Sequence, residues 1–157
     1  MTIDRKDRSI LMALQEDAKQ SSRDLSKKLD LPATTIHERI RKMEKDGIIK
    51  GYHVAIDYEK AEMPSTAIVL IKRTPIIKSG KKIIYRKIAD LIAKLPEIQE
   101  VHTLSGEFDM MLKIRGRNER DIGNFVSDII WSLPEVERTQ TLLCFHTAKD
   151  TCKIELK

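Results

Sequence analysis

The sequence predicts an α+β protein with an N-terminal winged helix-turn-helix domain and a C-terminal ferredoxin-like βαββαβ domain. In the first 50 residues, apolar side chains recur at the spacing of three short helices, and only a few residues separate the second helix from the third. The remaining chain shows strand and helix patterns in the order β-α-β-β-α-β. We therefore expect domains at residues 1–50 and 65–157, joined by a linker strand or hinge at 51–64.

Composition favours a folded, soluble protein without catalytic or metal chemistry. The 157 residues are 41% apolar and 34% charged, no apolar run is long enough for a bilayer, and the chain starts with charged residues. Cys144 and Cys152 lack metal-ligand spacing, so we expect Cys144 in a buried strand and Cys152 as a free thiol. Phosphate-binding loops and nucleophile elbows are missing as well. We expect a cytoplasmic protein that is not an enzyme and has no cofactor or metal.

Two helices open the chain, each with a predicted capping box. Asp4 can cap the first helix with Asp7 three residues later, and Ser21 can cap the second with Asp24 in the same relation. Apolar residues at helical spacing mark the buried sides, namely Ile10, Leu11, Leu14 and Ala18 in the first helix and Leu25 and Leu29 in the second.

A third helix is predicted from Pro32, which suits a helix start, to about Lys45, where Asp46-Gly47 ends it. Its apolar stripe is narrow and consists of Ile36, Ile40 and Met43. The opposite face carries hydrogen-bonding side chains, namely Thr34, Glu38, Arg41 and Lys45, flanked by His37 and Lys42. Residues 48–57 then alternate like a strand, with a turn or bend at Gly51.

The polar face of the third helix has three interpretations. It resembles a solvated helix with i,i+4 ion pairs, and the same three-helix unit also occurs as a protein-docking domain. A short turn between the last two helices is typical of a helix-turn-helix, whose last helix enters the major groove. Net charge decides little, because the total is +5 and residues 1–57 hold 12 Lys or Arg against 10 Asp or Glu.

The second half contains four predicted strands and two helices. Strands are expected at residues 65–73, 97–104, 108–115 and 137–149, with a turn at Ser105-Gly106. The apolar residues of the first helix are Ile83, Ile84, Ile88, Leu91, Ile92 and Leu95, and those of the second are Ile122, Phe125, Val126, Ile129, Ile130 and Leu133. Each helix ends at a Leu-Pro pair, and the order is that of a ferredoxin-like fold.

Four segments together resemble the leucine-responsive regulatory protein (Lrp)/AsnC family of transcription regulators. They are DRKDRSILMALQEDAKQSSRDLSKKLDL, IHERIRKMEKDGIIKGYHVAID, VHTLSGEFDMMLKI and LPEVERTQTLLCF, and they follow the family's order along nearly the whole chain. The resemblance implies a sequence-specific regulator that binds double-stranded DNA at a pseudo-palindromic operator. It also implies effector binding and oligomerisation by residues 65–157, through homodimers that often assemble into tetramers or octamers, and an amino acid or similar small effector.

The chain departs from the family pattern at three places. Pro32 stands where a serine or similar N-cap usually opens the third helix, and Asp30 stands where a glycine usually precedes it. Ala61-Glu62 stands near the usual Leu-Gly after the linker. In addition, residues 72–87 carry seven basic side chains and no acid. This stretch is either a solvated loop and helix face or a second surface for DNA or a partner.

For DNA, the candidates are Ser21, Thr34, Thr35, His37, Glu38, Arg41 and Lys42. Residues at the start of a recognition helix approach base edges, so Thr34, Thr35 and His37 are expected there. Glu38 can accept from cytosine, Arg41 can reach guanine or phosphate, and Lys42 is expected at phosphate. The helix that begins after Ser21 can donate backbone amides to a phosphate.

For the effector, the resemblance maps a glycine-x-x-aspartate turn to residues 106–109. Gly106 would allow a close approach of the main chain, and Asp109 would meet an ammonium group. Thr139 and Thr141 could supply hydroxyl groups from one face of the last strand. Asp109 could equally serve only the hairpin turn.

Three rival functions remain open on sequence alone. Siroheme decarboxylase subunits have a similar two-domain architecture, and His102 and Arg115 lie in adjacent predicted strands where a tetrapyrrole would need them. A sensor or docking module that has lost DNA binding is a second rival, although the polar face of the third helix argues against it. A member that binds DNA without any effector is the third.

Overall fold

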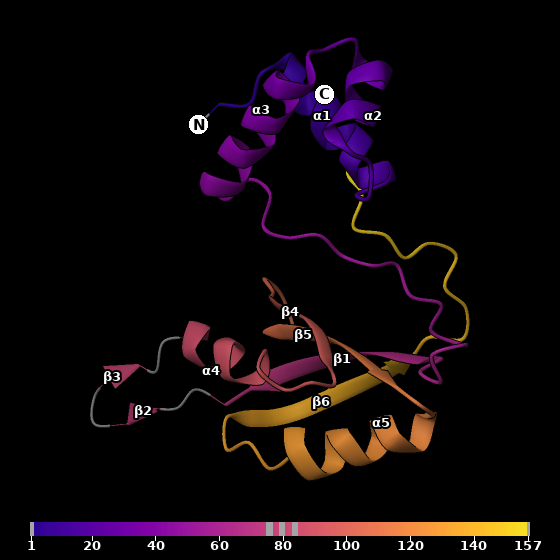
Figure 1. The fold of residues 1–157 in the computed structure, drawn as a ribbon. Helices are drawn as coiled ribbons and strands as arrows, with labels where there is room; N and C mark the ends of the chain where they lie inside the picture. Colours follow the sequence, from indigo (N-terminus) through magenta and orange to yellow (C-terminus); the bar gives the residue numbers. More distant parts are fainter. Residues whose placement is uncertain (1, 75–76, 79–80, 83–84, 157) are drawn as a thin grey trace. The chain divides into compact units, whose positions relative to one another are not determined.

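The computed structural model describes residues 2–74, 77–78, 81–82 and 85–156, and of residues 77–78, 81–82 and 85–87 it describes the backbone alone. The chain forms two compact units, residues 1–55 with 149–157 and residues 56–148 (Figure 1). The basic side chains predicted at 78–87 and the apolar pair Ile83 and Ile84 therefore lie outside the described residues. Within the described residues, no helix is both long and apolar enough to cross a membrane.

Three helices make up the first unit, α1 (Arg5–Glu16), α2 (Ser22–Leu29) and α3 (Ala33–Lys45). Both predicted capping boxes are confirmed. The Asp4 carboxylate accepts from the Asp7 amide at 2.8 Å while Asp7 accepts from the Asp4 amide at 3.0 Å, and Ser21 and Asp24 make the same reciprocal pair. These bonds satisfy backbone donors that a helix start otherwise leaves free.

The core of the first unit lies where the three helical stripes meet. Its buried side chains are Ile10, Ala13, Leu14, Leu25, Ile36 and Met43. Ile40 is half-buried against this core, so the predicted stripe of α3 faces inward as expected. Residues 48–57, predicted to alternate like a strand, form none, and residues 51–57 run as an irregular, exposed segment. The physical reason is that a strand needs a hydrogen-bonding neighbour, and the described part of this chain provides none there.

A four-stranded sheet forms the second unit, together with the small hairpin of β2 (Ile77–Lys78) and β3 (Lys81–Lys82). The sheet strands are β1 (Ser65–Arg73), β4 (Ile98–Thr103), β5 (Met110–Gly116) and β6 (Val136–Leu143). They lie in the antiparallel order β4-β5-β1-β6. With helices between β1 and β4 and between β5 and β6, this is the predicted ferredoxin-like arrangement (Figure 1).

The helices cover one face of this sheet. Ile88 and Ile92 of α4 (Tyr85–Ile92) pack with residues of α5 (Glu119–Phe125) and of the following π-helical segment η1 (Val126–Ile130) against the strands. The strand residues of this core are Ala67, Val69, Ile71, Met110, Leu112 and Ile114. Two predicted helix stripe residues do not join it, because Leu91 is 64% exposed and Ile129 is 39% exposed.

The last strand is shorter than predicted. β6 ends at Leu143, whereas the apolar pattern predicted a strand over residues 137–149. Its partner β1 begins at Ser65, and the last bond between them runs from the Cys144 amide to the Thr66 carbonyl. Beyond that point β1 offers no further partner groups. The prediction that Cys144 is buried is also wrong, because Cys144 is exposed, and both cysteines are free thiols.

Candidate nucleic-acid interface and effector site

The outer face of α3 carries most of the residues predicted to contact DNA. The exposed members of this set are Thr34, His37, Glu38, Arg41 and Lys42. Thr35 is less accessible than these residues, because it is half-buried. They lie opposite Ile36 and Met43, which are completely buried. One helix therefore presents hydroxyl, imidazole, carboxylate and cationic groups on a surface held in place by its buried side.

Arg39 anchors α3 to the start of α1, a role that the sequence did not indicate. The Arg39 guanidinium lies 2.7 Å from Asp7, whose side chain is 1% exposed, and 2.7 Å from Asp4. Its hydrogen bonds to Asp7 and then to Asp4 raise the pKa of Arg39. The capping box of α1 thereby also positions the polar face of α3.

The turn before α3 closes without the usual glycine. Asp30 adopts the left-handed conformation with φ of 52° and ends α2 there. The Ser26 hydroxyl donates to the Leu31 carbonyl at 2.6 Å, which closes the turn. Pro32 occupies the cap position of α3 and, as its lack of a hydroxyl requires, makes no side-chain capping bond. The turn thus forms through residues that depart from the family pattern.

Ser21 lies at the start of α2 with its hydroxyl already engaged. Its Oγ lies 2.6 Å from an Asp24 oxygen and accepts from the Asp24 amide at 3.2 Å. The Ser21 hydroxyl and then its backbone amide lower the pKa of Asp24. A phosphate at this helix start would therefore meet a neighbouring carboxylate, so the backbone amides rather than the Ser21 side chain are the groups suited to it.

Asp109 lies at the start of β5 and is bonded to the end of β1. Its Oδ2 accepts from the Arg73 amide at 3.0 Å and lies 3.5 Å from the Lys72 ammonium. Its own amide donates to the Ile71 carbonyl at 2.9 Å. The side chain is 30% exposed, so one carboxylate serves the turn and still faces solvent in part.

Gly106 has a φ of +133°, a conformation that residues with a side chain rarely adopt. A Cβ atom at this position would meet nothing within 4 Å. The glycine is therefore required by the backbone conformation rather than by a lack of space.

Thr139 and Thr141 lie on β6, opposite Ile71 and Val69 of β1, and share the sheet face that the helices cover. Thr139 accepts a hydrogen bond from the indole nitrogen of Trp131 at 2.8 Å. Because β6 is an edge strand, these hydroxyls lie at the margin of that face.

Arg138 joins the turn to β6 and was not predicted. Its guanidinium forms an ion pair with Glu107 and lies 5.2 Å from the centre of the Phe108 ring. Two members of the 106–109 turn are thus held by the residue next to Thr139. A cation 31 residues from its partner gives no signal that sequence spacing could detect.

The chain matches known families over both units. Residues 3–50 match the winged helix-turn-helix DNA-binding family, and residues 66–154 match the Lrp/AsnC ligand binding domain. The transcriptional regulator FL11 of Pyrococcus horikoshii is 39% identical over 155 residues, which are 99% of this chain and 97% of that protein. The chain belongs to the Lrp/AsnC family.

Solved structures of Lrp/AsnC regulators share its fold. An AsnC family regulator from Agrobacterium tumefaciens has 27% identity and a TM-score of 0.86, covering 97% of this chain and 96% of its own. A regulator from Neisseria meningitidis, NMB0573, solved as a complex with L-Met, has 23% identity and a TM-score of 0.87, covering 98% and 96%. This Lrp/AsnC member is therefore a transcriptional regulator with a helix-turn-helix DNA-binding domain and a ligand-binding domain.

His102 and Arg115, considered above for a tetrapyrrole site, have other partners in this Lrp/AsnC protein. His102 pairs with Met111 across the sheet and contacts the Glu100 carboxylate at 3.2 Å. Arg115 is 8% exposed and stacks on the Tyr58 ring at 3.4 Å. Arg115 lies four positions along β5 from Met111, the partner of His102, and the relatives are named as transcriptional regulators.

Proposed function

We propose that this regulator binds a pseudo-palindromic operator as a cytoplasmic homodimer, without catalysis, through the outer face of α3. The main support for DNA binding is that one face of α3 exposes polar side chains while the opposite face is buried. The exposed side chains are Thr34, His37, Glu38, Arg41 and Lys42. The half-buried Thr35 at the helix start completes the surface. Amides at the start of α2, next to Ser21, would bind a phosphate.

The open face of the sheet supports dimerisation. On the face that α4 and α5 leave uncovered, β1 carries the half-buried Ile68 and Leu70, paired with Lys113 and Met111 of β5, and β6 carries Leu142, which is 43% exposed. A sheet usually buries its apolar face, and a second copy of this sheet would cover these side chains. Tetramers or octamers would add further contacts between such dimers.

Selection of bound fragments from genomic DNA, followed by footprinting, tests the operator proposal. Two recognition helices on one face of the duplex should protect half-sites about 10 bp apart, or a multiple of that. Protection without two-fold symmetry at every protein concentration would contradict the proposal.

We further propose that an amino acid binds the C-terminal domain near the turn of residues 106–109. Support comes from the ligand-binding family match over residues 66–154 and from the related regulator solved with L-Met. Asp109 would meet the ammonium group, Gly106 would let the main chain approach, and Thr139 and Thr141 would bond the polar atoms of the ligand.

Calorimetry with each common amino acid, combined with sedimentation before and after addition, tests the effector proposal. A ligand that prefers one assembly must shift the populations by its difference in affinity. We expect heat and a changed sedimentation coefficient with the same compound. If no amino acid gives heat, the effector proposal is wrong, and the protein is a DNA-binding regulator that needs no effector.

A further inference from the structure

Residues near the end of the sequence dock on the DNA-binding unit, although they follow the second compact unit along the chain. The Gln15 side-chain amide of α1 donates to the Ile154 carbonyl at 3.1 Å, and its oxygen accepts from the Ile154 amide at 2.7 Å. One side chain thus bonds both backbone groups of a residue 139 positions later. Next to it, the Lys153 ammonium lies 3.1 Å from the Glu16 carboxylate.

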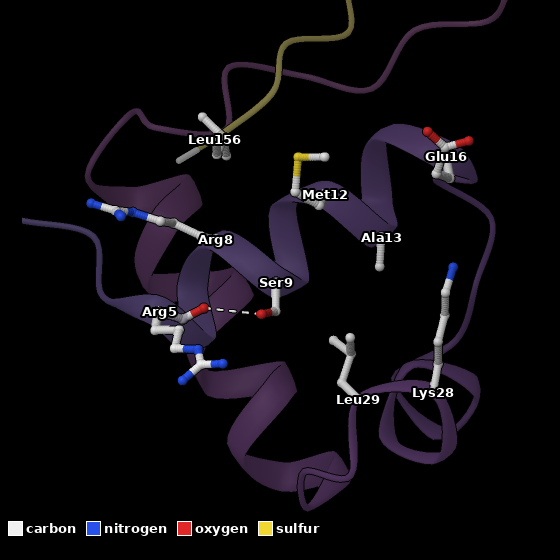
Figure 2. Close-up of a pocket in the computed structure, with 9 residues that line it drawn as sticks. All are labelled: Arg5, Arg8, Ser9, Met12, Ala13, Glu16, Lys28, Leu29 and Leu156. Atoms are coloured by element: carbon white, nitrogen blue, oxygen red, sulfur yellow. Dashed lines mark hydrogen bonds between the residues drawn. The ribbon is translucent and has the colours of Figure 1, made fainter.

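This contact borders a hollow of about 660 Å³ on the first unit (Figure 2). Figure 2 shows that α1, the end of α2 and Leu156 of the terminal segment surround it. Apolar side chains of Met12, Ala13 and Leu29 line it together with Leu156. Paired hydrogen bonds and an ion pair therefore hold the terminal segment on the end of α1, and Leu156 lines the hollow beside them.

The chain consequently connects the two compact units twice. It enters the second unit at Ile56 and leaves it after Ala148. Nine residues, 144–152, separate the end of β6 from Lys153, where the contacts with α1 begin, and nine residues span at most roughly 32 Å. A domain held by two connections has less freedom to move than a domain held by one.

We propose that residues 149–156 act as a strap that restrains the DNA-binding domain so that both domains of a dimer can engage their half-sites together. The inference rests on the proposed dimeric operator binding. Linked binding events gain affinity through a high effective concentration, which falls as the linked parts become freer to move. The strap follows β6 along the chain. Thr139 and Thr141 of β6 belong to the proposed effector site, and Arg138 of β6 holds the turn of that site.

Two variants release the strap, and a third serves as a control. Gln15→Ala removes both hydrogen bonds to Ile154 without changing the net charge. Lys153→Ala removes the ion pair with Glu16, and Lys149→Ala removes the same charge from an exposed position of the same segment. Hydrogen exchange of the Ile154 amide in the full-length protein measures docking directly. Affinity is then measured on a duplex with two half-sites and on one with a single half-site.

We expect faster exchange at Ile154 in Gln15→Ala than in wild type. On the duplex with two half-sites, Gln15→Ala should bind roughly three- to tenfold more weakly than wild type. Lys153→Ala should bind more weakly than its charge-matched control Lys149→Ala by a similar factor. On the duplex with a single half-site, neither variant should differ from its reference protein. Equal losses on both duplexes, or no loss despite faster exchange, would overturn the proposal. An Ile154 amide unprotected in wild type would overturn it too. A wild type with no preference for two half-sites would refute the operator proposal, a separate result.

Discussion

Arg39 of α3 and Asp7 of α1 form an ion pair at 2.7 Å in which the aspartate is almost completely buried. The Asp7 carboxylate also accepts a hydrogen bond from the Asp4 amide, so the same group caps α1 and holds α3. The Arg39 side chain is itself 27% exposed. The orientation of the polar face of α3 therefore depends on a charge pair that links two helices.

Arg39→Ala should destabilise the DNA-binding domain by about 2–4 kcal/mol, because it leaves the buried Asp7 carboxylate without its cation. The free energy of unfolding in urea, followed by circular dichroism, measures this effect. Arg41→Ala removes an exposed arginine two residues later and should change that free energy by no more than about 0.5 kcal/mol. Equal stability of the two variants would show that the pair does not hold the domain.

Acid should destabilise the same domain through its helix caps. The Asp7 amide and then Arg39 lower the pKa of Asp4, and the Ser21 hydroxyl lowers the pKa of Asp24. A lowered pKa in the folded state contributes stability above the ordinary aspartate value of about 3.9, and this stability is lost as the pH falls through the folded pKa. Asp24→Asn should therefore melt below wild type at neutral pH. The difference should shrink as the pH falls below the ordinary aspartate value of about 3.9, and a constant difference would contradict the assignment.

Sequence predicted the local features of the fold well. The two capping boxes, the stripe of α3 and the strand order follow from spacing within one element or from the order of elements, both of which a sequence displays. The end of β6 was wrong because it depends on where β1 begins, more than 70 residues away. The strand predicted over 48–57 failed for the same reason, since alternation does not supply a neighbouring strand.

In the candidate sites too, sequence predicted the features that depend on local spacing and missed the contacts between distant residues. The polar face of α3 follows from helical periodicity, and the structure exposes five of the six residues of α3 predicted to contact DNA, all but Thr35. The side chains that position these groups were not predicted, because Arg39 meets Asp7 across 32 residues and Arg138 meets Glu107 across 31. Gln15 and Ile154 are 139 residues apart. Contacts at such separations require the folded chain.

Two non-glycine residues with positive φ offer a route to a more stable protein. Asp30 has φ of 52° and Glu62 has φ of 60°, at or near the positions where the resemblance led us to expect glycine. Left-handed backbone costs an L-residue about 1–2 kcal/mol, less for aspartate, while glycine adds about 0.4–1 kcal/mol of unfolded-state entropy. Glu62→Gly should therefore stabilise the ligand-binding domain by about 0.5 kcal/mol or more, and Asp30→Gly should gain less.

Thermal unfolding of these variants checks that order. Glu59→Gly, in the same exposed turn but without a positive φ, is the matched control and should not be stabilised. A Glu62→Gly variant no more stable than Glu59→Gly would show that the conformation of Glu62 costs nothing.

Arg41→Ala and Lys42→Ala should weaken DNA binding without unfolding α3, because both side chains lie away from its buried stripe. A phosphate contact should lower affinity equally for all sequences and reduce the salt slope by about 1. A base contact should cost about 1–3 kcal/mol and relax one operator position. Binding of a selected operator at several salt concentrations distinguishes these roles. Wild-type affinity and salt dependence in both variants would place the interface elsewhere.

Asp109→Asn separates the structural role of Asp109 from its proposed role at the effector. The asparagine oxygen can still accept a hydrogen bond from the Arg73 amide, so only the partly exposed ion pair with Lys72 is lost, which is worth about 1 kcal/mol. Loss of a charged hydrogen bond to a ligand ammonium group should instead weaken binding by about tenfold or more. Calorimetry with the amino acid that binds wild type, alongside thermal unfolding, compares the two. A variant that is stable but binds poorly supports contact with the ligand, whereas unchanged affinity leaves Asp109 as the group that fastens the start of β5 to the end of β1.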